Sequence, residues 1–149
     1  MITGPRDRFG IRFSVLARRW RTYIDHTLAA SGLTDATWAP LVHLDRTGDG
    51  VPQKVLAERI GIDSSTLVRL IDILETRDLV ERRTDPADRR ARRLYLTPSG
   101  RQAVNAIKIA LVEAEKRMLA GVSDAEIEAA LVVFDKIDRR LGDTDEGAE

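Results

Sequence analysis

Most of the chain carries apolar side chains at the spacing of an α-helix. Near the N-terminus, for example, Phe9, Phe13 and Leu16 recur three and four positions apart. Such spacing places apolar side chains on one face of a helix. Together with the cap residues, the pattern predicts six helices, over residues 7–30, 35–47, 52–60, 64–77, 98–120 and 124–141.

Residues that favour helix ends lie at the boundaries of these segments. Ser31-Gly32 should end the first helix, and Thr34 should cap the second. Pro40 lies inside the predicted second helix and should bend it, because proline has no N–H to donate. The other helix starts are marked by Pro52 at a first helical position, Asp63 as a cap, Thr97 before Pro98, and a capping box of Ser123 with Glu126.

The periodicity changes between the fourth and fifth helices. Residues 79–83 and 92–96 are short strand-like runs, and Asp85-Pro86-Ala87-Asp88 between them is typical of a turn. This segment therefore predicts a β-hairpin. The fold class expected is mainly α with a small β-hairpin wing: a winged helix-turn-helix with long N- and C-terminal dimerisation helices.

The last two helices are too long for a winged helix-turn-helix alone. A helix of about 22 residues spans roughly 33 Å. Apolar residues on these helices still require burial, and a second copy of the chain is the economical partner. We therefore expect one domain over 1–149, with dimerisation helices at 7–32 and 98–141, a winged helix-turn-helix at 34–97 and an acidic tail at 142–149.

The formal net charge of zero conceals a strong asymmetry along the chain. Residues 82–101 contain seven arginines and two aspartates, a net charge of +5. Residues 1–30 have a net charge of +4, whereas residues 121–149 have a net charge of −6. A basic region beside an acidic one is compatible with a nucleic-acid partner despite the neutral total.

Several function classes are excluded by composition and by missing motifs. The chain has no cysteine, and its two histidines, His26 and His43, lie far apart, so we expect no metal site and no cofactor. No phosphate loop or nucleophile elbow indicates an enzyme. The longest run free of charged residues is nine, and the N-terminus is polar, so we expect no membrane segment and a cytoplasmic protein.

Residues 53–72 have the pattern of a helix-turn-helix. Ala57 is small enough for close helix packing, and Gly61 permits the tight turn. The second helix should enter a major groove, where hydroxyls can bond phosphates or base edges, Arg69 can contact guanine, and the helix N-terminus favours a phosphate. The outward-facing candidates are Ser64, Ser65, Thr66 and Arg69.

The predicted hairpin carries its basic residues at the turn. Asp88 is followed by Arg89, Arg90 and Arg92, and its carboxylate could orient one of these arginine side chains through an ion pair. An arginine at such a tip can enter a minor groove, where the potential is negative. The alternative is a charged turn that contacts only solvent.

These motifs together resemble the DNA-binding core of the MarR family of regulators. The resemblance rests on residues 61–69, 88–91 and 94–97, and extends over residues 8–141; residues 20–26 and 67–69 are most similar to the SlyA group. It implies a bacterial, nucleoid-associated homodimer that binds double-stranded DNA at a palindromic operator, with Arg69 in the major groove and Arg89 or Arg90 in the minor groove. Two residues depart from the family pattern: Asp78, where the family often has glycine, and Pro40.

Aromatic and cationic residues gather in the first two predicted helices. Family members are often regulated by small aromatic carboxylates such as salicylate, and aromatic walls with a cation suit such a ligand. The candidate pocket residues are Arg18, Trp20, Arg21, Tyr23, His26, Trp38 and His43. The alternative is that these aromatics belong to the core or to the dimer interface.

A second function also fits the sequence. A winged-helix dimer that serves as a protein-interaction module, without specific DNA binding, would agree with the neutral net charge. The outward polar residues of the helix-turn-helix and the wing arginines favour the DNA-binding regulator instead.

Overall fold

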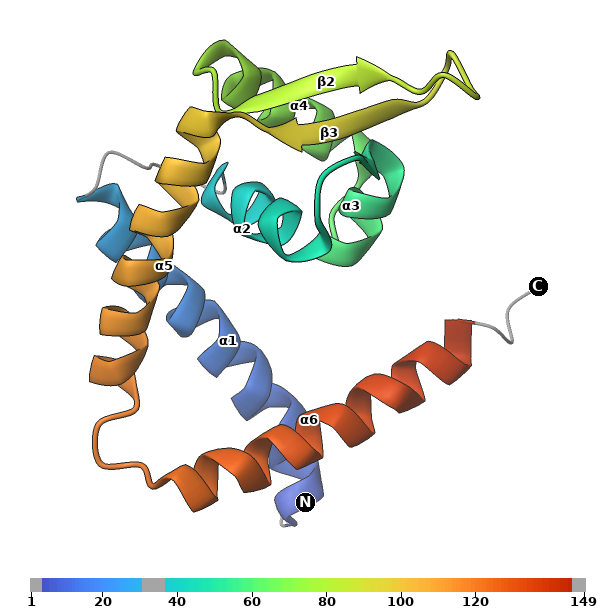
Figure 1. Ribbon diagram of the computed structural model, residues 1–149. Helices are drawn as coiled ribbons and strands as arrows, with labels where there is room; N and C mark the ends of the chain where they lie inside the picture. The colour runs from blue at the N-terminus through green and yellow to red at the C-terminus, as the bar shows by residue number, and fades with distance from the viewer. Residues whose placement is uncertain (1–3, 31–36, 146–149) are drawn as a thin grey trace. The chain divides into compact units, whose positions relative to one another are not determined.

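The computed structural model describes residues 4–30 and 37–145. The predicted turn at Ser31-Gly32 and the predicted cap Thr34 lie outside these residues. Contacts divide the chain into two compact units, Met1–Ala114 and Glu115–Glu149. Figure 1 shows the elements in chain order: α1 Pro5–Ala29, α2 Trp38–Thr47, β1 Val51–Pro52, α3 Gln53–Ile60, α4 Ser64–Thr76, β2 Val80–Thr84, β3 Arg92–Leu96, α5 Pro98–Met118 and α6 Asp124–Asp145.

The mainly helical fold with a small sheet is confirmed, and two local predictions are wrong. α2 begins at Trp38, so Pro40 lies in its first turn, where an N–H has no partner within the helix. No ladder bond is lost there, and the proline gives no reason for a bend. Pro52 is the cap of α3 rather than its first residue, because Val51 and Pro52 form a short strand.

The helix-turn-helix consists of α3 and α4, as predicted. Gly61 ends α3 with a φ of +79°, a left-handed conformation that glycine adopts without steric cost. Its N–H and that of Ile62 both donate to the Ala57 carbonyl, at 3.0 and 3.1 Å. Asp63 then caps α4, as its position in the sequence indicates. The turn is therefore fixed by hydrogen bonds at both helix ends.

The sheet has three antiparallel strands in the order β1-β3-β2. β2 and β3 form the predicted hairpin, and β1 adds a short third strand through the pairing of Val51 with Leu94. Val80, Leu94 and Leu96 are buried beneath the sheet. The loop between β2 and β3 projects beyond α3 and α4, which makes this hairpin a wing (Figure 1).

A strained residue joins α4 to the wing. Asp78 has a φ of +57°, a left-handed conformation that aspartate adopts less easily than glycine. Asp78 N–H donates to the Glu75 carbonyl at 3.0 Å, and Leu79 N–H donates to the Leu74 carbonyl at 2.9 Å. These two bonds close the C-terminal turn of α4 and fix the direction in which the wing leaves it.

The core lies between α2, α3, α4, the sheet and the first half of α5. Its fully buried side chains include Leu41, Leu44, Leu56, Leu67, Ile71, Leu74, Leu94, Val104 and Ile107. α1 contributes only Ile24 and Leu28 near its C-terminal end. In the second unit, α6 begins with the predicted capping box: Ser123 N–H donates to Glu126 at 2.8 Å, and Glu126 N–H donates to the Ser123 hydroxyl at 3.2 Å.

Candidate nucleic-acid interface

The first two turns of α4 present polar side chains to solvent. Ser64, Ser65 and Arg69 are exposed and Thr66 is half-buried, whereas the apolar side of the helix is buried. Three of the four side chains that we predicted to face outward are therefore exposed, and Thr66 is exposed only in part. The buried residues of the opposite side are Leu67, Leu70, Ile71 and Leu74.

Hydrogen bonds to Asp63 decide what two of these hydroxyls can do. The Asp63 carboxylate accepts from Thr66 N–H at 2.6 Å, from the Ser65 hydroxyl at 2.7 Å and from the Thr66 hydroxyl at 3.0 Å. These bonds lower the pKa of Asp63 below its ordinary value, and the bond from the Thr66 N–H has the largest effect. The Ser65 and Thr66 protons are thus used, and both oxygens remain as acceptors. A carboxylate at this helix end also disfavours the phosphate that we expected there.

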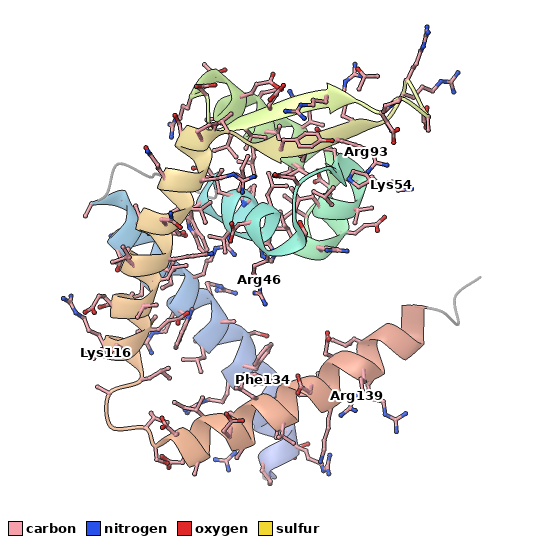
Figure 2. The ribbon with its side chains drawn as sticks, in the orientation of Figure 1. Arg46, Lys54, Arg93, Lys116, Phe134 and Arg139 are labelled. Carbon is pink, nitrogen blue, oxygen red and sulfur yellow. The ribbon has the colours of Figure 1, made fainter. Side chains whose placement is uncertain are left out.

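At the base of the wing, Arg93 is held by a carboxylate that the sequence did not single out. Arg93 Nε donates to Asp85 at 2.9 Å, and Arg93 Nη1 donates to the Gly50 carbonyl at 2.7 Å. The prediction that Asp88 holds an arginine side chain finds no support, because Asp88 accepts from the Arg90 backbone N–H at 3.0 Å instead. Figure 2 shows Arg93 where the hairpin meets the start of α3, close to Lys54.

Four more arginines of residues 82–101 are also engaged within the fold. Arg83 forms two hydrogen bonds with Glu81, each at 3.1 Å, and lies 4.0 Å from the centre of the Tyr95 ring. The others are Arg82, bound to Asp72; Arg92, which donates to the Thr84 hydroxyl at 3.1 Å; and Arg101, paired with Asp49. Most of the predicted basic charge is therefore compensated by acids or used to brace the hairpin.

Three of the arginines predicted to contact DNA have uncommitted guanidinium groups. Arg69, Arg89 and Arg90 are exposed, and their guanidinium groups have no hydrogen-bond or ion-pair partner within residues 4–30 and 37–145. Arg69 belongs to α4, while Arg89 and Arg90 lie at the wing tip. Of the four arginines predicted to contact DNA, these three are the ones whose guanidinium groups are wholly uncommitted, because Arg92 donates to the Thr84 hydroxyl.

A shallow depression of about 230 Å³ lies between the wing and the start of α3. Arg90 and Arg92 from the wing line it together with Lys54 from α3 and Ser64 from α4, and the other lining residues are Pro52, Gln53 and Ala91. Lys54 was not among the predicted site residues. Its position next to the cap of α3 was readable from the sequence, but the approach of the wing to that helix end was not.

Part of the predicted ligand group lies at the junction of α1 and α2. Arg21 lies over the Trp38 ring, 5.0 Å from its centre, and Trp38 Nε1 donates to Asp25 at 2.7 Å. Burial lowers the pKa of His43, and Arg46 and Arg21 lower it further. Asp25 was missing from the predicted group. Trp20 is half-buried, and the remaining predicted residues, Arg18, Tyr23 and His26, are exposed on α1.

Two kinds of feature are absent from the described residues. Within residues 4–30 and 37–145, no three side chains of histidine, cysteine or acidic type are grouped so that they could hold a metal ion. None of the helices described is both long and apolar enough to cross a membrane.

Comparisons with known proteins converge on one group of transcriptional regulators. A family model described as "MarR family" matches residues 31–91. The crystal structure of the transcriptional regulator PA3341 is 32% identical to this chain, covers 91% of this chain and 98% of its own, and superimposes with a TM-score of 0.82.

Three further solved structures, of two proteins, widen the comparison. CouR from Rhodococcus jostii RHA1 is 28% identical and is known bound to p-coumaroyl-CoA (TM-score 0.77, covering 91% of this chain and 94% of its own). The transcriptional repressor CouR is also known bound to a 23-mer DNA duplex (28% identity, TM-score 0.78, covering 87% of this chain and 91% of its own). The regulator SlyA, at 21% identity and a TM-score of 0.81 over 95% of this chain and 99% of its own, shares the fold.

Proposed function

This chain belongs to the MarR family of transcriptional regulators, and we propose that it binds a specific double-stranded DNA sequence as a homodimer. The observation that carries the proposal is that three arginines predicted to contact DNA are exposed and uncommitted. Arg69 projects from the helix that a winged-helix protein places in the major groove, where arginine recognises guanine. Arg89 and Arg90 at the wing tip suit the negative potential of a minor groove.

The DNA-bound structure of CouR supports the assignment of DNA as the ligand. For a twofold-symmetric dimer, we expect a palindromic operator with half-sites about 10 bp apart, centre to centre. Lys54 and Arg92, which line the depression beside the wing, suit the phosphates next to the bases that Arg69 contacts. The hydroxyls of Ser65 and Thr66 would accept hydrogen bonds from base amino groups, because their protons are directed to Asp63.

Selection of genomic fragments by the purified protein tests this function. We expect a bound palindrome of about 16–20 bp that binds far more tightly than bulk DNA. Arg69→Ala should relax the preference at one base position of each half-site, while Arg77→Ala, which removes an exposed arginine from the end of α4, should leave the motif unchanged. Fragments without a shared motif, released at moderate salt, would instead favour the protein-interaction module.

The dimer is supported by apolar side chains that the single chain leaves exposed. On α1 these are Phe9, Ile11, Phe13, Val15 and Leu16, and on α6 they include Leu131, Val132, Val133 and Ile137. The two ends of the chain also carry opposite net charges, +4 over residues 1–30 and −6 over residues 121–149. A second copy would cover the apolar positions and bring basic and acidic segments together. Sedimentation at micromolar concentration should give twice the mass of one chain.

A small aromatic carboxylate is the regulator that the α1–α2 junction suits best. Arg21 supplies a cation next to the indole of Trp38, and His43 lies near the same arginine. CouR, whose bound p-coumaroyl-CoA carries an aromatic acyl group, supports an aromatic ligand for this chain. Millimolar salicylate should therefore raise the melting temperature and change the affinity for the selected DNA. Arg21→Gln should abolish both effects. If salicylate acted on this variant as on the wild type, the ligand would have to bind away from Arg21.

A further inference from the structure

Arg82 makes more contacts than any other arginine described in the wing. Its Nε donates to the Gln53 side chain at 3.2 Å, its Nη1 to Asp72 at 2.5 Å and its Nη2 to the Val68 carbonyl at 3.0 Å. Its Nη1 also lies 3.6 Å from Glu75, which accepts from the Arg82 backbone N–H at 3.2 Å. All three guanidinium nitrogens are thus engaged, and the side chain is only 17% exposed.

The partners of Arg82 come from three different elements. Arg82 belongs to β2, Gln53 begins α3, and the other partners lie on α4. Val68, Asp72 and Glu75 are spaced four and three residues apart, so they form one stripe along α4. A single planar guanidinium therefore ties the wing to both helices of the helix-turn-helix.

The position of these contacts connects the two surfaces that we assign to DNA. The Val68 carbonyl belongs to the peptide unit that leads into Arg69, the exposed arginine of α4. Residue 82 lies at the centre of β2, whose C-terminal end leads to the loop that carries Arg89 and Arg90. A change in the Arg82 contacts would thus alter the separation between the wing tip and the helix turn that carries Arg69.

We propose that Arg82 is a positioning residue that holds the wing and α4 at the separation at which Arg69 and the tip arginines contact DNA together. This inference rests on the proposed function. Arg82 itself is too buried and too fully engaged to contact DNA as an exposed arginine does. Its role requires the geometry of a guanidinium, since an ammonium group cannot serve three separated acceptors in one plane.

A double-mutant cycle on the selected operator measures this coupling. In the wild type, replacing both Arg89 and Arg90 by alanine should weaken binding by about tenfold or more. In an Arg82→Met background the same replacement should weaken operator binding by less than about twofold, because the wing is no longer held against the groove. The ratio of the two effects, which measures the coupling between Arg82 and the tip arginines, is then at least about fivefold. Arg77→Met, which removes an exposed guanidinium at the end of α4, should leave the loss of binding caused by replacing Arg89 and Arg90 unchanged.

Two further variants separate geometry from charge and from folding. Arg82→Lys keeps the positive charge, so restored coupling in this variant would show that charge, not position, is what Arg82 provides. Gln53→Ala removes only the partner of Arg82 Nε. It should also reduce the effect of replacing the tip arginines, but by less than Arg82→Met does. It therefore keeps the test available if Arg82→Met does not fold.

Nuclear relaxation of backbone amides tests the same inference without DNA. In the free wild-type protein, the hairpin amides from Val80 to Leu96 should have order parameters near 0.85, about the value of a rigid backbone. In Arg82→Met the tip amides should fall below about 0.6, while those of α4 stay unchanged. The proposal would be overturned if the wing stayed rigid in Arg82→Met and replacing the tip arginines weakened operator binding as much in this variant as in the wild type. If the wild type selects no operator, the proposed function fails, and relaxation still decides whether Arg82 holds the wing.

Discussion

α4 and α6 carry similar apolar patterns, but only α4 buries them. Leu67, Ile71 and Leu74 of α4 are fully buried in the core of the first unit. On α6, Leu131 is 47% exposed, and its apolar neighbours are exposed to a similar degree. Periodicity thus predicts a helix and the side of it that is apolar, but it does not identify what covers that side. For α4 the cover is the same chain, and for α6 we propose a second copy.

The largest expected effect is on the α4 side of this comparison. Leu74→Ala removes a fully buried side chain and leaves a cavity, so it should lower the free energy of unfolding by about 2–5 kcal/mol. Chemical denaturation measures this loss. Val68→Ala, at an exposed position of the same helix, serves as the control and should cost far less. A similar loss in both variants would mean that α4 is not packed as described.

Charge on α6 tests the other side of the comparison. Leu131→Asp should weaken self-association by at least about tenfold, because each of two copies would bury a carboxylate in place of an apolar side chain. Sedimentation over a range of concentrations measures this. The control is Glu128→Gln, which changes an exposed polar residue of the same helix. If Leu131→Asp remained fully dimeric, the interface would have to exclude this position.

A third prediction separates the tip of the wing from its base. Replacing both Arg89 and Arg90 by alanine should cost about 1–3 kcal/mol of operator-binding free energy. The slope of log binding constant against log salt concentration should fall by roughly two. The melting temperature should not change, because neither guanidinium has a partner within the described residues. Arg93→Ala should show the opposite pattern, with a lower melting temperature, because Arg93 binds Asp85 and the Gly50 carbonyl.

The smallest effect is expected where α1 meets the core. The fold lowers the pKa of His43, mainly through burial and then through Arg46 and Arg21. The unfolded chain therefore binds this proton more readily than the folded protein, and stability should fall as the pH decreases below about 6.5. Urea unfolding at pH 7.5 and 5.5 should show this loss in the wild type and in His26→Gln, but less of it in His43→Gln. Equal losses in all three would exclude His43 as the source.

The helices and the hairpin could be predicted because local patterns determine them. The cap at Asp63, the turn at Gly61 and the capping box at Ser123 are each fixed by residues within four positions. β1 could not be predicted, since two residues show no alternation, and Val51 joins the sheet only through Leu94. The expected bend at Pro40 failed because it depended on a helix boundary, which the sequence locates only within a few residues.

The site was predictable as a surface but not as a set of contacts. Arg82 and Arg93 are indistinguishable from Arg89 in a run of arginines, because their partners are set by the folded chain. Arg82 binds Asp72 and Gln53, which are 10 and 29 positions away. The hairpin register pairs Arg93 with Arg83, only two positions before Asp85, and the Arg93 side chain reaches the Asp85 carboxylate from there. Which arginines stay free for DNA is therefore a property of the fold.

The most direct test of the central claim is a competition titration at fixed salt. A labelled duplex carrying the selected palindrome is bound by the wild-type protein and then displaced by unlabelled palindrome or by a scrambled duplex of the same composition. We predict that the scrambled duplex competes at least about a thousandfold less well. Equal competition by the two duplexes would contradict the assignment of this chain as a sequence-specific DNA-binding regulator.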